Sequence, residues 1–154
     1  MLDFRKATIS DINNLAKIRS IFLQEANDVS SEIERHNMEI ASKTYFENAV
    51  ADDSFVAWLA LNGDNIIATS GLSFSVVPPS FKCPDGKTAY IMNMYTFPEY
   101  RKQGIGMKLL EKIVEEAKNR SCKKITLNAT DMGRPLYEKY GFKDIAGDMV
   151  FYVD

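Results

Sequence analysis

The alternation of apolar and polar residues divides the chain into short helices and strands. Apolar residues at helical spacing, preceded by a Thr8–Asp11 capping signature, predict a first helix that includes Ile12 to Phe22. A weaker pattern predicts a second helix over Ser31–Val50. The clearest amphipathic pattern follows a glycine-rich turn at 101–106, and its apolar positions are Ile105, Leu109, Leu110, Ile113, Val114 and Ala117.

Segments with strand character surround these helices. They are Phe4–Ala7, Phe55–Leu61, Ile66–Val77 (with a break or bulge near Gly71), Thr88–Thr96, Lys123–Asn128 and Met149–Val153. The turn residues 62–65 predict a hairpin, whereas the strand–helix–strand unit at 88–128 predicts a parallel pair. A last short helix lies between Pro135 and Gly141. The order predicts an α/β or α+β class with one mixed sheet.

Composition narrows the class of protein. The 154 residues suit one domain over 1–154, and 45% hydrophobic with 26% charged residues is a globular balance. No apolar run approaches the roughly 20 residues that span a bilayer, and the N-terminus lacks a signal-peptide pattern. Cys83 and Cys122 form no recognisable framework, so we expect a cytoplasmic protein without a membrane partner.

Charge and histidine content exclude further classes. The net charge of −2 argues against a nucleic-acid partner bound by a broad basic face. His36 is the single histidine, which disfavours histidine-rich metal sites and histidine-based triads, and no metal is expected.

The turn from Arg101 to Gly106 carries the most specific local chemistry. A helix N-terminus presents unpaired N–H groups, glycines let a ligand approach the backbone, and Arg101 and Lys102 add positive charge. This combination favours a phosphate or pyrophosphate. The third glycine of a dinucleotide fingerprint and the Lys–Ser/Thr pair of a Walker loop are both missing. The turn alone fits an anion site and a tight turn with solvated cations equally well.

Two longer motifs are recognisable. The stretch YTFPEYRKQGIGMKLL (Tyr95 to Leu110) resembles the acetyl-CoA-binding motif of the GNAT superfamily of N-acetyltransferases. LYEKYGF (Leu136 to Phe142) resembles that superfamily's second motif, and the opening FRKATISDI is similar to GNAT N-termini. The resemblance covers essentially the whole chain in order. It implies a single mixed, mostly antiparallel sheet with splayed central strands, flanked by about four helices.

The resemblance also implies a site for acetyl-CoA. The pyrophosphate would lie on backbone N–H groups from Gln103 to Met107, with Arg101 and Lys102 supplying charge, and pantetheine would pair with Met94–Thr96. The position of the family's cofactor-contacting asparagine is Thr130 here, with Asn128 two places earlier. The residues implied to bind the cofactor are Met94, Tyr95, Thr96, Arg101, Lys102, Gln103, Gly104, Ile105, Gly106, Met107, Asn128 and Thr130.

The implied reaction is direct acetyl transfer from acetyl-CoA to an amine. A backbone N–H near Met94 or Tyr95 would polarise the thioester carbonyl, and Tyr137 would give a proton to the leaving thiolate. Tyr137 could instead be a packing residue of a short helix. The general base is not readable from the sequence, and its candidates are Glu25, Asp28, Glu32, Glu34 and His36.

We expect an N-acetyltransferase whose acceptor is the primary amine of a small molecule. A protein N-terminus or lysine as acceptor, and a non-catalytic acyl-CoA-binding module, stay open as alternatives. A nucleotide-binding α/β domain would bind NAD or ATP instead. Many GNAT proteins are dimers, so a homodimer is expected.

Overall fold

The computed structural model describes residues 1–27 and 31–153 of the chain. Its strands are β1 (Leu2–Lys6), β2 (Phe55–Val56), β3 (Trp58–Asn62), β4 (Asn65–Val76), β5 (Lys87–Thr96) and β6 (Lys124–Leu127). Its helices are α1 (Ile12–Asn27), α2 (Glu32–Ala51), α3 (Ile105–Asn119) and α4 (Arg134–Tyr140), with single 3₁₀ turns η1 (Ile9–Asp11) and η2 (Pro98–Tyr100).

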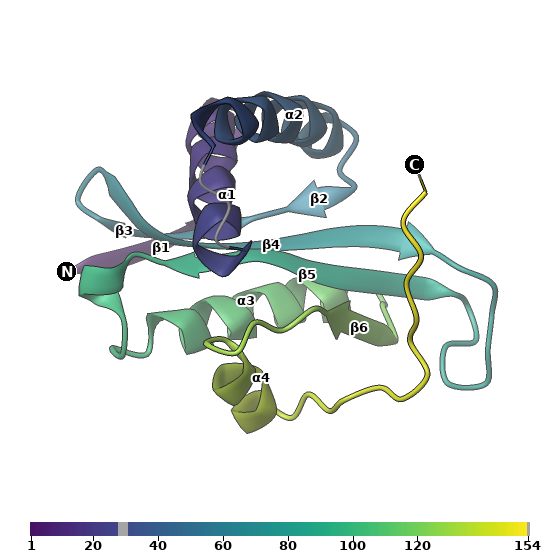
Figure 1. The fold of residues 1–154 in the computed structure, drawn as a ribbon. Coiled ribbons are helices and arrows are strands. Elements are labelled where there is room, and N and C mark those ends of the chain that lie inside the picture. The colour runs from purple at the N-terminus through teal and green to yellow at the C-terminus, as the bar shows by residue number, and fades with distance from the viewer. Residues whose placement is uncertain (28–30, 154) are drawn as a thin grey trace.

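The described strands form one sheet in the order β1-β3-β4-β5-β6, with β2 paired to β4. All pairs are antiparallel except β5 with β6, where the α3 crossover returns the chain in the same direction. Helices α1 and α2 cover one face of the sheet, and α3 and α4 lie on the other (Figure 1). This arrangement confirms the predicted mixed, mostly antiparallel sheet flanked by four helices.

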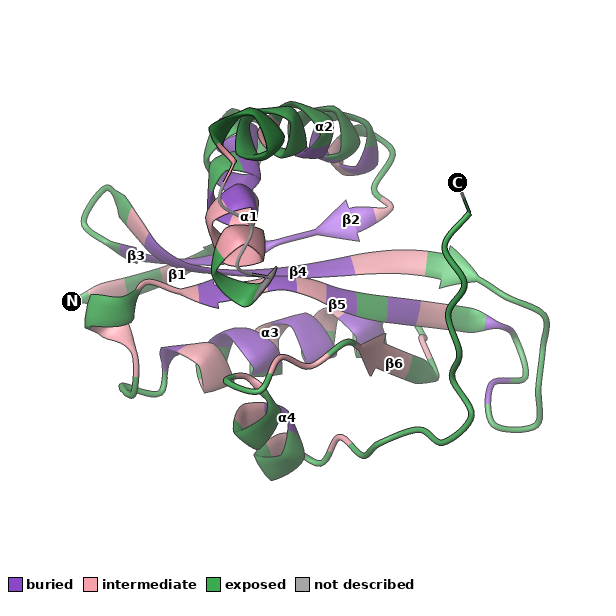
Figure 2. Cartoon of the chain, viewed as in Figure 1, coloured by how far each residue is buried: buried purple, intermediate pink, exposed green. Residues whose placement is uncertain are grey.

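Each face of the sheet has its own apolar core, visible as buried segments on the inner sides of the helices (Figure 2). Under α1 and α2, the core includes Leu15, Phe46 and Phe55. On the opposite face, α3 buries all six positions that its sequence pattern predicted, Ile105, Leu109, Leu110, Ile113, Val114 and Ala117. Burial of this stripe fixes α3, and therefore the glycine turn before it, against the sheet.

The predicted strand at Phe55–Leu61 is wrong as a single element, because it is interrupted at Ala57. The reason lies on the neighbouring strand, where the Ser70 hydroxyl accepts a hydrogen bond from the Trp58 N–H at 3.3 Å and donates to the Trp58 carbonyl at 3.0 Å. A side chain there takes the place of regular ladder bonds, so β2 and β3 are separate strands.

The predicted final strand at Met149–Val153 is also wrong. These residues form no strand in the described part of the chain, and their side chains are exposed. In Figure 1 the segment runs as plain coil to the C-terminus. Apolar, β-prone residues form a strand only where an edge pairs with them, and β6 is a four-residue edge strand paired to β5 alone. The two strands that splay apart are therefore β5 and the edge strand β6.

No helix among residues 1–27 and 31–153 is long and apolar enough to cross a membrane. Within the same ranges, no group of three or more His, Cys, Asp or Glu side chains is arranged to hold a metal ion.

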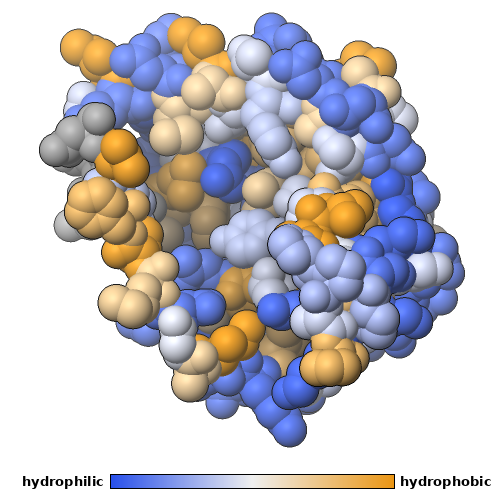
Figure 3. All heavy atoms as spheres, turned by 90° about the vertical axis from the view of Figure 1, so that its right-hand side faces the viewer, coloured by the Kyte–Doolittle hydropathy of each residue, from blue (hydrophilic) through white to orange (hydrophobic). Residues whose placement is uncertain are grey.

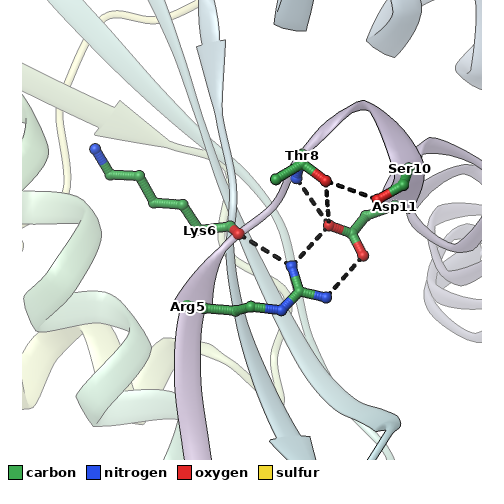
Figure 4. A network of polar contacts seen from close by, with 5 residues as sticks. All are labelled: Arg5, Lys6, Thr8, Ser10 and Asp11. Carbon is green, nitrogen blue, oxygen red and sulfur yellow. Dashed lines mark hydrogen bonds and ion pairs between the residues drawn. The ribbon is translucent and has the colours of Figure 1, made fainter.

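A buried carboxylate fixes the entry into α1. The backbone N–H of Thr8 donates to Asp11 Oδ2 at 2.7 Å, and Arg5 donates to both carboxylate oxygens at 2.8 and 3.0 Å. Figure 4 shows these side chains converging on Asp11. Hydrogen bonding from Arg5, aided by Thr8 and the charge of Arg5, outweighs burial and holds the pKa of Asp11 below its ordinary value.

We predict that Asp11→Ala lowers the free energy of unfolding by about 2 kcal/mol, because a cap and a charge-assisted hydrogen bond are lost together. Since the folded state lowers the Asp11 pKa, this stabilisation is present above the unfolded pKa of about 3.9 and is lost as the pH falls through the folded value. Urea unfolding at pH 7 and pH 3 measures both effects.

The matched control is Asp3→Ala, because Asp3 is an exposed carboxylate on the neighbouring β1. We expect it to change stability by less than about 0.5 kcal/mol. Equal losses in the two variants at pH 7 would contradict the role assigned to Asp11.

Candidate functional site

The site begins where the ladder between β5 and β6 ends. The two strands pair from Thr88–Lys124 to Ile91–Leu127, after which β6 stops. β5 continues to Thr96 while still pairing with β4 on its other edge. The backbone of Met94–Thr96 therefore lies on an edge that no described strand covers, and this edge confirms the predicted splay.

A bulge at the same point turns the side chains of β5. The register with β4 shifts between Thr69 and Gly71, opposite Asn93, whose φ is 60°. Beyond the bulge, Met94 packs on the α3 side of the sheet, whereas Tyr95 reaches α1 on the other. Two consecutive residues of β5 thereby place their side chains on opposite faces of the sheet, next to the point where β5 and β6 part.

Gly71 and Asn93 make this bulge tight. A Cβ at Gly71 would lie 2.8 Å from the carbonyl oxygen of Met92, so a side chain there needs the backbone to move. Asn93 is 1% exposed, and its side-chain N and O atoms have no hydrogen-bond partner within the described residues. An unpaired buried amide is costly, which identifies the bulge as a strained position.

The glycine turn places the N-terminus of α3 beside the open edge. Gly104 is the N-cap with a φ of 80°, a conformation that costs glycine little, and no side chain caps the helix. The first N–H groups of α3 therefore have no side-chain acceptor. Lys102 has a φ of 61° and is exposed. A Cβ at Gly104 would meet nothing within 4 Å, so the backbone is open to approach there.

These elements enclose a cavity of about 790 Å³. Of the twelve predicted cofactor residues, all except Gln103 line it, and they are Met94, Tyr95, Thr96, Arg101, Lys102, Gly104, Ile105, Gly106, Met107, Asn128 and Thr130. The Gln103 side chain instead turns back toward the Glu99 carbonyl at 3.4 Å. Predicted residues far apart in the sequence are thus brought to one site.

Arg101 is held by a carboxylate that the sequence pattern did not connect to it. Its Nη2 donates to Glu25 Oε1 at 2.8 Å, and its Nε donates to the Thr96 carbonyl at 2.8 Å. The hydroxyl of Tyr95 donates to Glu25 Oε2, also at 2.8 Å. Arg101 further lies over the Tyr95 ring, 5.3 Å from its centroid. The end of α1 is therefore tied to β5 and to the glycine turn.

This cluster shifts two ionisation equilibria. Partial burial favours neutral Glu25, but the hydrogen bonds from Tyr95 and Arg101 and the charge of Arg101 outweigh it, so its pKa is lowered. Burial, followed by the hydrogen bond to Glu25, raises the pKa of Tyr95 to about 12. Near neutral pH the site thus presents a carboxylate and a protonated phenol.

Tyr137 enters the cavity from α4. The residue is 9% exposed, and its hydroxyl makes no hydrogen bond to any of the residues 1–27 and 31–153. Burial, with a smaller effect of Tyr90, raises its pKa to about 12. Gly133 makes room for the ring, since a Cβ there would lie 3.1 Å from Tyr137 Cε2. Tyr137 is therefore both packed and available as a donor toward the cavity.

Thr130 and Asn128 both lie on the cavity wall between β6 and α4. The Thr130 hydroxyl accepts a hydrogen bond from the Gly133 N–H at 3.1 Å and so stabilises the turn into α4. The threonine at the family's asparagine position therefore has a local structural task in addition to its place on the wall.

The candidates for the general base separate into three groups. Glu25 lines the cavity, whereas Glu32 and His36 lie at a distinct depression on α2, and Glu34 is exposed on the same helix. Asp28 lies outside the described residues. Glu25 lies beyond the apolar pattern that predicted the first helix, and α1 continues through it to Asn27.

Sequence reasoning did not identify several other residues of the cavity wall. They are Phe22, Ala26, Thr69, Tyr100, Asp131, Met132, Gly133, Leu136 and Lys139. The i, i+4 spacing of Phe22 and Ala26 along one helix face was the available signal for the α1 wall.

Comparison with known proteins agrees with this geometry. Residues 16–142 match the acetyltransferase (GNAT) family. A thialysine N-epsilon-acetyltransferase of Mus musculus is 35% identical over 57 residues, which are 37% of this chain and 34% of the relative. A glucosamine 6-phosphate N-acetyltransferase of Trypanosoma brucei brucei is 27% identical over 73 residues, which are 47% of this chain and 50% of the relative. The chain thus spans about a third to a half of these relatives.

Solved structures match along the entire fold. A predicted acetyltransferase from Clostridium acetobutylicum, crystallised with acetyl-CoA, is 36% identical, with a TM-score of 0.92 over 99% of this chain and 96% of that one. A GCN5-related N-acetyltransferase from Ralstonia eutropha JMP134 is 27% identical, with a TM-score of 0.90 over 99% of each chain. Together with the parted strands and the glycine turn, these matches show that the chain belongs to the GNAT acetyltransferase family.

Proposed function

We propose that this chain is an acetyl-CoA-dependent N-acetyltransferase that acts on the primary amine of a small molecule by direct transfer in a ternary complex. The observation that supports the proposal most is the convergence of three features on one cavity. They are the open backbone edge of Met94–Thr96, the uncapped N-terminus of α3 and the hydroxyl of Tyr137.

The donor set of the cavity suits acetyl-CoA. Backbone N–H groups between Gln103 and Met107 would hold the pyrophosphate, with Lys102 and Arg101 adding charge at its edge. The open edge of Met94–Thr96 would pair with the pantetheine amides as a strand does. The wall is largely apolar where Met94, Met107 and Leu136 line it, which suits the pantetheine chain.

The residues of the chain then supply the chemistry. Acetyl-CoA, when bound, contributes an acyl group activated as a thioester. A backbone N–H at Met94 or Tyr95 would polarise its carbonyl oxygen. The amine nitrogen forms a bond to the carbonyl carbon as the bond from carbon to sulfur breaks, and the nitrogen gives up one proton while the thiolate gains one.

We propose that Tyr137 interacts with the sulfur of the leaving thiolate. With its pKa near 12, against about 8.5 for a thiol, complete transfer of the phenolic proton is uphill by roughly 5 kcal/mol. Tyr137 would therefore donate a hydrogen bond that stabilises the developing thiolate, or donate a proton in a transfer that solvent completes.

We propose that Glu25 binds the amine of the acceptor. Its carboxylate stays ionised at neutral pH because Tyr95 and Arg101 hold its pKa low, and it lines the cavity next to the bulge. A carboxylate with a low pKa is a weak base for an alkylammonium with a pKa of about 10.4. Its contribution would be to attract and orient the ammonium group before it loses a proton.

A turnover screen tests the proposal. Thiol release from acetyl-CoA is measured with polyamines, amino acids, aminoglycosides and peptides with free N-termini. Turnover of a small amine supports the proposal, and turnover of peptides alone assigns a protein acceptor. Acetyl-CoA binding with no turnover would favour a non-catalytic acyl-CoA module, whereas binding of NAD or ATP instead of acetyl-CoA would contradict it altogether.

We predict that Gly106→Ala separates stability from cofactor binding. An alanine in the first turn of α3 keeps the free energy of unfolding or raises it by up to about 1 kcal/mol, since the new Cβ lies 3.4 Å from Leu136, an ordinary contact. The methyl group also stands where phosphates approach the backbone, so acetyl-CoA affinity falls roughly tenfold.

Calorimetric titration with acetyl-CoA measures this effect. Lys118→Ala, an exposed change near the far end of the same helix, serves as control and leaves the affinity unchanged. Full affinity in the Gly106→Ala protein would argue against a pyrophosphate at this helix end.

We predict that Tyr137→Phe lowers turnover at least tenfold, roughly 1.4 kcal/mol in the barrier, while acetyl-CoA still binds. The hydroxyl is lost but the buried ring stays. Steady-state thiol release and calorimetry give the two quantities. Tyr140→Phe on the same helix is the control, because Tyr140 packs against Phe142 and does not line the cavity. Unchanged turnover in Tyr137→Phe would contradict the proposal that the Tyr137 hydroxyl assists the leaving thiolate.

The single-domain organisation, the homodimer and the cytoplasmic location inferred from the sequence stay predictions.

A further inference from the structure

Arg19 faces the sheet from the middle of α1. It lies four residues after Leu15, which is fully buried in the core, and three and seven residues before Phe22 and Ala26, which line the cavity. These spacings put all four residues on one stripe of the helix. Arg19 is half-buried, between the apolar core and the cavity wall.

The guanidinium of Arg19 has no acidic partner among the described residues. Of the six arginines, four pair with carboxylates, namely Arg5, Arg101, Arg120 and Arg134, and Arg35 is exposed. Arg19 forms neither an ion pair nor a hydrogen bond with any of residues 1–27 and 31–153. A half-buried cation without a counter-charge is costly, and arginine in such a place is typical of carboxylate or phosphate recognition.

The surroundings of Arg19 are polar and reachable. Tyr45 of α2 and Tyr90 of β5 lie close enough to interact with it electrostatically, and they are 40% and 39% exposed. Burial lowers the pKa of Arg19, yet a guanidinium stays charged near neutral pH. Figure 3 shows a hollowed face of the molecule on which hydrophobic and hydrophilic residues adjoin.

Arg19 and Glu25 give α1 two opposite charges on the side of the acceptor. They are six residues apart, about 9 Å along the helix axis. Glu25 contacts Tyr95 and Arg101 at the bulge, whereas Arg19 lies near Tyr90, five residues earlier on β5. An acceptor whose amine meets Glu25 at the reacting end could therefore extend a negative group toward Arg19.

We propose that Arg19 binds an anionic group of the acceptor, so that the preferred substrate is an amine that carries a carboxylate or a phosphate at its other end. The inference rests on the proposed acetyl transfer and names its acceptor class. Tyr45 and Tyr90 would add hydroxyl donors to the same anion. Arg19 would act as a binding residue and would touch no reacting atom.

Matched acceptor pairs test this proposal. The carboxylate arm compares 6-aminohexanoate with hexylamine, and L-lysine with cadaverine, and the phosphate arm compares glucosamine 6-phosphate with glucosamine. The wild-type protein should favour the anionic member of at least one arm by tenfold or more in kcat/KM. The arm that shows the preference identifies which anion is used.

Arg19→Gln should reduce that preference at least tenfold through KM, and Arg19→Lys should restore part of it. Lys17→Gln is the matched control, because Lys17 is exposed on the same helix, and it should leave the preference unchanged. Thermal unfolding checks that each variant is folded. No anion preference in the wild-type protein, or equal loss for both members of a pair in Arg19→Gln, would overturn the proposal.

A separate readout distinguishes failure of the proposed function. If no amine is acetylated, the transfer reaction itself is contradicted, and calorimetry on CoA-saturated protein then decides about Arg19. Binding of the anionic amine that is at least tenfold weaker in Arg19→Gln supports the anion site. Equal binding by the wild-type and variant proteins contradicts it.

Discussion

The hydrogen-bonded ladder between β5 and β6 ends after Ile91 and Leu127, and the site depends on that early end. Had β6 continued, its backbone would cover Met94–Thr96, and no edge would be available to a pantetheine chain. Because β6 stops and the chain turns away toward α4, the open edge faces both the N-terminus of α3 and Tyr137. One missing stretch of pairing thus brings the proposed cofactor contacts together.

The bulge that accompanies the parting is held in place at a cost. Asn93 combines a φ of 60° with a buried amide that has no partner in the described residues, and Gly71 leaves no room for a Cβ. Strain of this kind persists only where the surroundings fix it. Here the regular β4–β5 ladder before the bulge and the tie from Glu25 to Tyr95 and Arg101 beyond it supply that support.

Local patterns in the sequence predicted most of the fold. The stripe of α3, the capping residues before α1 and the hairpin at 62–65 are determined by neighbours in the chain, and the structure agrees with them. The interruption at Ala57 depends on the Ser70 side chain from another strand. Met149–Val153 has strand-forming residues but no paired edge. Both errors concern contacts that a local pattern does not contain.

The candidate site was predictable where motifs carry it. Eleven of the twelve residues that the resemblance implied for cofactor binding line the cavity, and so does Tyr137 of the α4 motif. The proposed acceptor side was only partly predictable. Glu25 was one of five base candidates, and its contacts with Tyr95 and Arg101, like the nearness of Arg19 to Tyr90, join residues about 70 positions apart in the chain. From sequence alone, a charged residue on a helix is interpreted as part of the solvated surface. Only the tertiary structure shows which groups it faces.

We propose that the open edge of β5 and the first turn of α3 hold the cofactor, and amide hydrogen exchange with and without saturating acetyl-CoA measures both segments at once. Exchange should become slower in peptides covering 92–96 and 101–107, with little change in α2. Slower exchange confined to other segments, or unchanged exchange at both of these while acetyl-CoA binds, would contradict it.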